Sequence, residues 1–160
     1  GCYPTSLLHL VVQTMSGPDA FGTRSVTAVG TRNNDGNVTD TAISIRFDNG
    51  VLASLQSTDE YGMAHAFTVT GSNGTLTFDT NPWLPVAGRN QLTWKPFDGD
   101  AEVIVVDDDD DAFFHQVQMV ERHVQVGDAE AARPSPRLDD SLENMRLLTD
   151  WEAAIPSTSN

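Results

Sequence analysis

The sequence has 160 residues, 39% of them hydrophobic, which suits about one globular domain. Its 23 acidic residues against 9 basic ones give a formal net charge of −14, which excludes nucleic acid and anionic membranes as favoured partners, because both bind cationic surfaces. Cys2 is the only cysteine and Lys95 the only lysine, which excludes an internal disulfide, a thiolate metal site and most lysine chemistry.

The chain opens with GCYP and passes directly into a helical pattern. Pro4 suits the first turn of a helix, and Gly17 followed by Pro18 ends the pattern, which predicts a helix over 3–15. The apolar residues at helical spacing are Leu7, Leu8, Val11 and Met15. Without a starting methionine, a secretory signal or an apolar run of about 18 residues, the sequence indicates a fragment of a cytoplasmic protein.

From residue 24 to about residue 106, apolar and polar residues alternate with the period of β-strands. Turn sequences rich in Asn, Asp and Gly separate the strands at 34–36, 48–50 and 72–74. Since such short connections join neighbouring strands as hairpins, we expect antiparallel pairing. The later strands of the pattern are expected over 75–79, 91–97 and 102–106.

The segment 81–85, NPWLP, interrupts this pattern because its two prolines cannot donate hydrogen bonds to a sheet ladder. We expect a loop that presents Trp83. Two interpretations stay open: Trp83 contacts a substrate pocket or a partner subunit, or it closes the edge of the sheet. We take Trp83 as the candidate substrate-binding residue.

After residue 107 the spacing becomes helical again and predicts helices over 112–126 and 140–155. Asp139 or Asp140 is the expected cap of the second helix. The apolar stripes of the two helices are Phe113, Val117, Val120 and Val124, and then Leu142, Met145, Leu148 and Trp151.

These elements predict an α+β fold: a single, mainly antiparallel, open sheet of about six strands, with the helices packed on one face. The whole chain, 1–160, forms one domain in this interpretation. Leu52 points away from the helices if Val51, Ala53 and Leu55 face them. Because open sheet faces rarely carry such residues without a partner, we expect this face to form a homo-oligomer, a dimer or a tetramer.

Metal and nucleophile motifs are weak in this sequence. Five consecutive aspartates, 107–111, could bind calcium, but they lack the glycine and the final glutamate of an EF-hand, and they precede a helix whose N-terminus favours acids. His115 and His123 are about 12 Å apart along one helix, so they cannot share a metal ion. We expect His9, His65 and these two to be surface residues. We predict no metal site.

Tyr3 has an unusual position, beside a glycine at the start of the first helix rather than within its apolar stripe. A phenol there can donate a proton when a neighbouring cation matches it. Position alone makes this a weak indication of catalysis.

Four segments together resemble the second domain of the Gfo/Idh/MocA oxidoreductases, which include glucose-fructose oxidoreductase and inositol dehydrogenases. They agree in order and spacing and extend over most of the chain. The segments are 1–4 (GCYP), 46–53 (RFDNGVLA), 69–76 (VTGSNGTL) and 140–146 (DSLENMR).

This resemblance implies the C-terminal, substrate-binding and oligomerisation domain of an enzyme that oxidises a hydroxyl of a sugar, polyol or related diol. NAD or NADP would bind to an N-terminal Rossmann domain absent from this chain, so the fragment alone would bind no cofactor and be inactive. The position of Tyr3 coincides with the family's proton-transfer position, which makes Tyr3 the candidate catalytic residue. The alternative is a non-catalytic, acidic, β-rich binding or assembly module.

Overall fold

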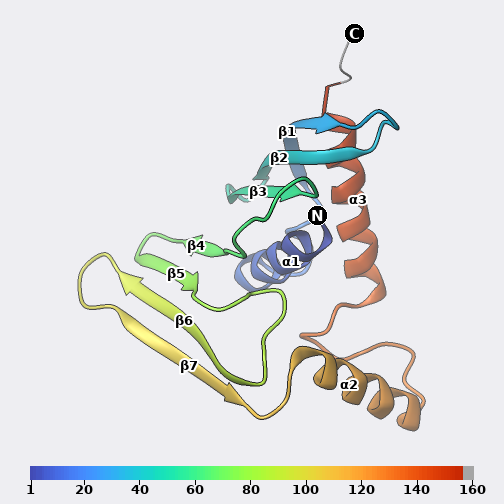
Figure 1. Ribbon diagram of the computed structural model, residues 1–160. Coiled ribbons are helices and arrows are strands. Elements are labelled where there is room, and N and C mark those ends of the chain that lie inside the picture. Colours follow the sequence, from blue (N-terminus) through green and yellow to red (C-terminus); the bar gives the residue numbers. More distant parts are fainter. Residues whose placement is uncertain (157–160) are drawn as a thin grey trace. The chain divides into compact units, whose positions relative to one another are not determined.

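The computed structural model describes residues 1–156, which divide into two compact units. Unit 1 comprises residues 1–63 and the chain from residue 132, and unit 2 comprises residues 64–131. In the described part (Figure 1), the helices are α1 (Cys2–Ser16), α2 (Ala112–Val126) and α3 (Leu138–Ala154). The strands are β1 (Arg24–Arg32), β2 (Val38–Phe47), β3 (Leu52–Thr58), β4 (Thr68–Thr70), β5 (Gly74–Phe78), β6 (Gly88–Pro96) and β7 (Glu102–Asp108).

Unit 1 contains a three-stranded antiparallel sheet in the order β1-β2-β3. Its register aligns Ala28, Ile43 and Leu55 in one row across the three strands, and all three are buried. Because side chains alternate along a strand, the neighbouring row points to the opposite face. That row consists of Thr27, Ser44 and Ser54 and is exposed.

The helices α1 and α3 pack against each other and cover one face of this sheet, with α3 on β1 and α1 on β3. The core lies between these layers, and every fully buried hydrophobic residue of the described chain belongs to unit 1. The core residues are Leu8, Val12, Phe21, Ala28, Ile43, Ile45, Phe47, Leu55, Leu147, Trp151 and Ile155. Residues near both ends of the described chain therefore join residues of the sheet in one core.

Unit 2 contains a four-stranded antiparallel sheet in the order β4-β5-β6-β7. One face carries the row Val69, Leu76 and Trp94, which are all half-buried. The other face carries Thr68, Thr77 and Thr93 in the row beside it. The strands thus have the apolar and polar faces that their period predicts.

The predicted α+β class and antiparallel pairing are confirmed, but the single sheet of about six strands is not. Seven strands form two sheets in the described residues. Residues 59–66, between β3 and β4, are exposed and belong to no strand. No described strand of one sheet pairs with a strand of the other. Alternation along a strand specifies its two faces but not its neighbours, which is why the sequence left this division undetermined.

The predicted packing of all the helices on one sheet face is wrong for α2. None of its residues is buried, and the stripe Phe113, Val117, Val120 and Val124 is exposed. Helical periodicity predicted α2 correctly, but it could not show whether another part of the chain covers the apolar stripe of this helix. Within residues 1–156, no helix is long and apolar enough to cross a membrane.

Candidate functional site

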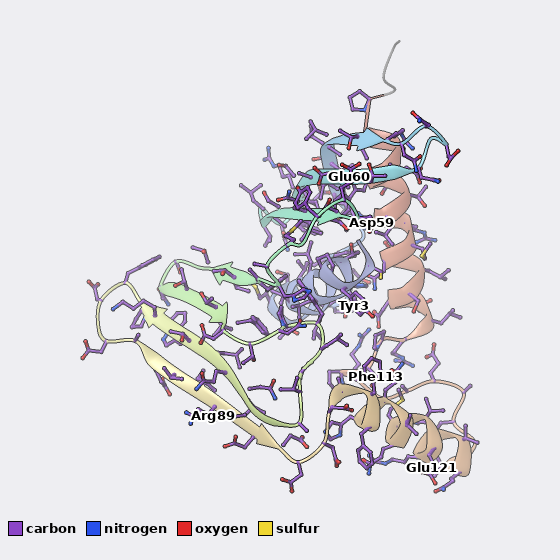
Figure 2. The ribbon with its side chains drawn as sticks, in the orientation of Figure 1. Tyr3, Asp59, Glu60, Arg89, Phe113 and Glu121 are labelled. Carbon is purple, nitrogen blue, oxygen red and sulfur yellow. The ribbon has the colours of Figure 1, made fainter. Side chains whose placement is uncertain are left out.

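Tyr3 lies in the first turn of α1 (Figure 2), and its side chain is 54% exposed. Its phenol makes no hydrogen bond to another residue within 1–156. The first-turn N–H groups of a helix have no partners inside the helix, so this end of α1 favours negative charge. An exposed phenol at such an end can exchange a proton with a small molecule that reaches it.

The start of α1 is held closely against α3 and β3. A Cβ atom added to Gly1 would lie 3.1 Å from Leu148 Cδ2, so a larger residue would press on α3. The backbone nitrogen of Gly1 donates a hydrogen bond to Ser57 Oγ at 2.9 Å. Thr5 Oγ1 donates to the Gly1 carbonyl at 2.9 Å, which secures the first turn.

An open cleft in unit 1 includes Gly1, two residues before Tyr3, in its lining. Hydroxyl, amide and carboxylate side chains contribute much of this lining, and such groups recognise polyhydroxylated molecules by hydrogen bonds. The polar residues are Asn37, Thr39, Thr41, Ser57, Thr58, Asp59 and Glu152. The apolar ones are Val38, Leu148, Trp151 and Ile155.

A polar network, in which His9 and Asp140 are buried, connects α1 with α3. His9 is only 3% exposed, and its ring stacks on Phe21 with centroids 3.9 Å apart. Its Nδ1 lies 3.0 Å from Asn144 Oδ1, and its Nε2 lies 2.8 Å from the side-chain amide nitrogen of Gln13. The same amide nitrogen donates to Asp140 Oδ1 at 2.9 Å.

Asp140 is the anionic centre of this network. Burial raises the pKa of its carboxyl, but hydrogen bonds from the Arg133 guanidinium, the Arg137 backbone and Gln13 outweigh burial and hold the pKa well below its ordinary value. Arg133 donates to both carboxylate oxygens, at 2.7 and 2.8 Å. The Arg137 N–H donates to Asp140 Oδ2 at 2.8 Å, so Asp140 caps α3 from inside its first turn.

The pKa of His9 is lowered from its ordinary value, chiefly because burial disfavours the charged ring. Asn144 and the Asp140 carboxylate act in the opposite direction but are weaker than burial. His9 is therefore neutral at pH 7. Since Gln13 donates to Nε2, the proton of the neutral ring is on Nδ1, where it reaches Asn144.

The expectation that His9 is a surface residue is wrong. The buried face of α1 consists of Thr5, Leu8, His9 and Val12, whereas Met15 is 57% exposed. Because the buried stripe includes the polar residue His9, the face of α1 that is buried lies part of a helical turn away from the predicted face. The signal that could have revealed it is the spacing of four between His9 and Gln13, matched by the same spacing between Asp140 and Asn144.

Trp83 lies in the loop between β5 and β6, as predicted, in unit 2. It is half-buried and meets the Phe67 ring edge-on at 6.0 Å. Asn81 Oδ1 accepts hydrogen bonds from the backbone N–H groups of Trp83 and Leu84, which shapes the loop. The indole N–H has no hydrogen-bond partner in the described chain. Tyr3 and Trp83 belong to different units.

Asp111, the last residue of the aspartate run, caps α2. Its Oδ1 accepts a hydrogen bond from the Phe114 N–H at 2.8 Å. Asp108 pairs with His115 at 2.9 Å, and His123 pairs with Asp128 at 3.2 Å. Between residues 1 and 156, no group of three or more His, Cys, Asp or Glu residues is arranged to hold a metal ion.

The described strands pair only antiparallel, and the sequence contains no Gly-x-Gly-x-x-Gly motif. A dinucleotide-binding unit needs parallel strands joined by a helix that starts at such a glycine turn. The described residues therefore lack the features of that kind of dinucleotide-binding unit.

No protein-family model and no curated protein matches the sequence. Solved structures do match. KijD10, a 3-ketoreductase from Actinomadura kijaniata in complex with NADP, is 21% identical with a TM-score of 0.75, over 97% of this chain and 46% of that chain. An aldose-aldose oxidoreductase from Caulobacter crescentus, complexed with glycerol, is 14% identical with a TM-score of 0.67, over 92% of this chain and 43% of that chain.

The chain spans less than half the length of these neighbours. Both are oxidoreductases of the Gfo/Idh/MocA type, so the resemblance predicted from the sequence is confirmed at the level of the fold. The chain thus has the fold of a part of these oxidoreductases.

Proposed function

We propose that this chain is the C-terminal, substrate-binding and oligomerisation domain of an NAD(P)-dependent oxidoreductase of the Gfo/Idh/MocA family. The observation that carries this proposal is the fold shared with a 3-ketoreductase across 97% of the chain. The substrate is a sugar, a polyol or a related diol. The neighbour that is an aldose-aldose oxidoreductase supports this substrate class, as does the polar cleft beside the start of α1.

The cofactor is NAD or NADP in the full-length protein and binds to an N-terminal domain outside this chain. The NADP complex of KijD10 supports this cofactor. A bound nicotinamide accepts or supplies a hydride. In this proposal the isolated chain binds no dinucleotide and is inactive.

Tyr3 moves the proton of the reacting hydroxyl. Its exposure at the N-terminus of α1 leaves the phenol accessible to a substrate, and the unpaired N–H groups of the first turn stabilise the charge that forms when the proton leaves. The coincidence of Tyr3 with the family's proton-transfer position supports the same role.

Trp83 contacts the substrate in this proposal. Its indole N–H is free to donate to a hydroxyl, and the edge-on contact with Phe67 holds the ring in place. Its half-buried position leaves part of the side chain accessible to a substrate.

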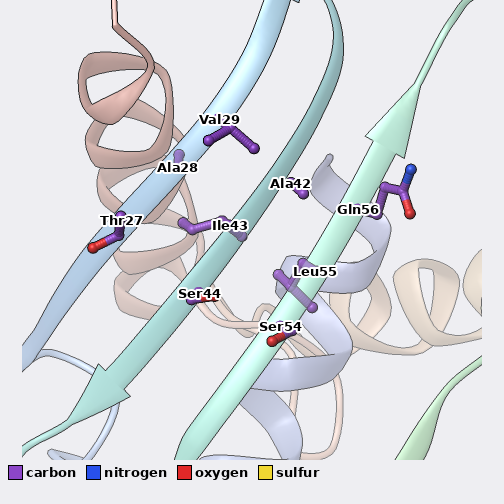
Figure 3. Close-up of a pocket in the computed structure, with 9 residues that line it drawn as sticks. All are labelled: Thr27, Ala28, Val29, Ala42, Ile43, Ser44, Ser54, Leu55 and Gln56. Carbon is purple, nitrogen blue, oxygen red and sulfur yellow. The ribbon is translucent and has the colours of Figure 1, made fainter.

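The open face of the unit 1 sheet forms the homo-oligomer contact. Figure 3 shows this face from the front, with α1 and α3 behind it and a hollow among the small side chains of Ala42, Ser44 and Ser54. Val29, at 64% exposure, borders the hollow, and Leu52, at 74%, lies on the same face. Apolar residues around a hollow of small ones suit a self-complementary contact.

The test uses the full-length protein and this chain side by side. NAD(P)H absorbance is followed with a panel of aldoses, ketoses and polyols. The proposal predicts turnover of at least one of them by the full-length protein and none by the isolated chain. A full-length protein that has no dinucleotide-binding domain, or that turns over none of the panel, would contradict it.

A further inference from the structure

We propose that His9, Gln13, Asp140 and Asn144 form a polar ladder that fixes the axial register of α1 on α3 and thereby positions Tyr3. This inference rests on the proposed role of Tyr3 and assigns His9 and Gln13 as positioning residues for the reaction. Neither contacts the substrate cleft.

The polar ladder has two rungs, which are the two hydrogen-bonded pairs that link the helices. His9 pairs with Asn144 at 3.0 Å, and Gln13 pairs with Asp140 at 2.9 Å. The two residues on each helix are four apart, and the higher-numbered residue of α1 meets the lower-numbered residue of α3. The helices therefore run antiparallel, and both rungs are satisfied in one register only.

The polar atoms that meet between the two helices are matched as donor and acceptor. The Gln13 amide uses both protons, one for His9 Nε2 and one for Asp140, and this leaves His9 Nδ1–H for Asn144. Arg133 and the Arg137 backbone hold the Asp140 carboxylate in place. A slip of α1 by one turn would pair at most one rung and leave buried groups unsatisfied, at a cost of about 1–3 kcal/mol each.

The apolar contacts beside the polar ladder do not select one register as strictly. Leu8 and Val12 of α1 and Leu147 of α3 belong to the same core, and aliphatic side chains pack with little directionality. Buried polar pairs, in contrast, specify register in paired helices because each alternative leaves a donor or acceptor without a partner.

Tyr3 is six residues before His9 on the same helix, about 9 Å along its axis. The close approach of Gly1 to Leu148 belongs to the same register, since it continues the antiparallel alignment beyond the His9 rung. A one-turn slip would displace the phenol by about 5.4 Å. Because a misplacement of about 1 Å can lower a rate about 100-fold, the register matters for proton transfer.

Gln13→Met in the full-length enzyme tests the positioning role, because it keeps the length of the side chain and removes both hydrogen bonds. We expect kcat to fall at least tenfold with KM within about twofold, measured well below the unfolding temperature. Gln125→Met is the matched control: Gln125 is exposed on α2 and its amide donates to Glu121 at 3.1 Å, so kcat stays within about twofold. A lower melting temperature with unchanged kcat for Gln13→Met would overturn the positioning role.

A second pair of variants covers the case in which Gln13→Met does not fold. Asn144→Leu removes the acceptor of His9 Nδ1–H, whereas Asn144→Asp retains it. We expect Asn144→Leu to lower kcat and Asn144→Asp to restore it at pH 8. Equal kcat in the two variants would contradict the positioning role.

Two further readouts separate this inference from the proposed function. Nitrogen-15 spectra should show His9 as the Nδ1–H tautomer in the wild type and a tautomer mixture in Gln13→Met; an unchanged tautomer would contradict the ladder. Tyr3→Phe in the same kinetic assay tests the proposed function. Loss of turnover in Tyr3→Phe with full turnover in Gln13→Met would overturn only the ladder's role, whereas full turnover in Tyr3→Phe would overturn both.

Discussion

Asp140 is the residue whose charge contributes most clearly to the stability of unit 1. Its folded-state pKa is depressed by Arg133, the Arg137 N–H and Gln13 despite burial, so its contribution is complete above its ordinary pKa of 3.8 and is lost as the pH falls further. Asp140→Asn should lower the free energy of unfolding at pH 7 by about 2 kcal/mol, because charged hydrogen bonds become neutral ones. Urea unfolding at pH 7 and pH 3 measures both effects.

The pH dependence of the variant provides the control for Asp140. Wild type and Asp140→Asn should converge in stability as the pH falls below 3.8, because the carboxyl is then increasingly protonated in the unfolded chain. A difference that stays constant from pH 7 to pH 3 would show that the charge of Asp140 is not responsible.

His9 should add an acid sensitivity at higher pH. Its folded-state pKa is depressed mainly by burial, so below about 6.5 the unfolded chain takes up the proton first and the folded state loses stability. The free energy of unfolding should therefore be lower at pH 5 than at pH 7.5. His9→Gln should remove this part of the decline, and an identical pH profile for variant and wild type would refute the assignment.

At the residue scale, sequence reasoning proposed Tyr3 and Trp83 as site residues but did not reveal the His9 network. Tyr3 was proposed because its position, beside a glycine at a helix start, has a family counterpart. His9 was not, because a polar residue in an amphipathic pattern normally faces water. Its burial depends on Asn144, which is 135 residues away, and no local pattern reports that contact.

At the element scale, periodicity and turn chemistry predicted the helices to within about two residues at most ends. Turns containing Gly36 and Gly50 also lie where Asn, Asp and Gly predicted them, and both glycines have positive φ. The buried stripe of α3 was predicted less well, since Met145 is 60% exposed and Leu147 is fully buried. Helical spacing identifies an apolar stripe, but α3 has alternative stripes, and only the packed partners select one.

The hairpin between β4 and β5 offers a test of close packing. A Cβ added to Gly74 would lie 2.7 Å from the Pro96 Cα and would also collide with the Lys95 carbonyl oxygen. Gly74→Ala should therefore destabilise unit 2 by about 1–3 kcal/mol. Gly71→Ala is the control in the same hairpin, because its Cβ would meet nothing closer than 4.0 Å. Thermal unfolding of both variants tests this expectation. Equal melting temperatures would count against this packing.

At the scale of the whole molecule, composition and strand patterns predicted an α+β chain but not its division into two units. The division depends on long-range contacts: the segment from residue 132 joins residues 1–63 to complete the core of unit 1. Unit 2 interrupts this core in the sequence. Local patterns do not show which distant segments share a core, so one sheet was the simpler prediction.

Self-association through the open face of the unit 1 sheet is expected to depend on Leu52. Leu52→Asp places a charge on this face and should shift the protein toward the monomer in sedimentation at high micromolar concentration. Leu142→Asp is the control, because Leu142 is 47% exposed on α3 rather than on this sheet. A monomeric wild type, or the same shift with Leu142→Asp, would count against the contact.

The most direct test of the central claim is the steady-state kinetics of Tyr3→Phe in the full-length enzyme. Removal of the phenol oxygen takes away proton transfer and leaves the ring, so kcat should fall by about 10²- to 10⁴-fold while KM changes little. The side chain is exposed, so stability should barely change. A kcat within about threefold of the wild-type value would contradict the account, because the proton would then move through groups outside this chain.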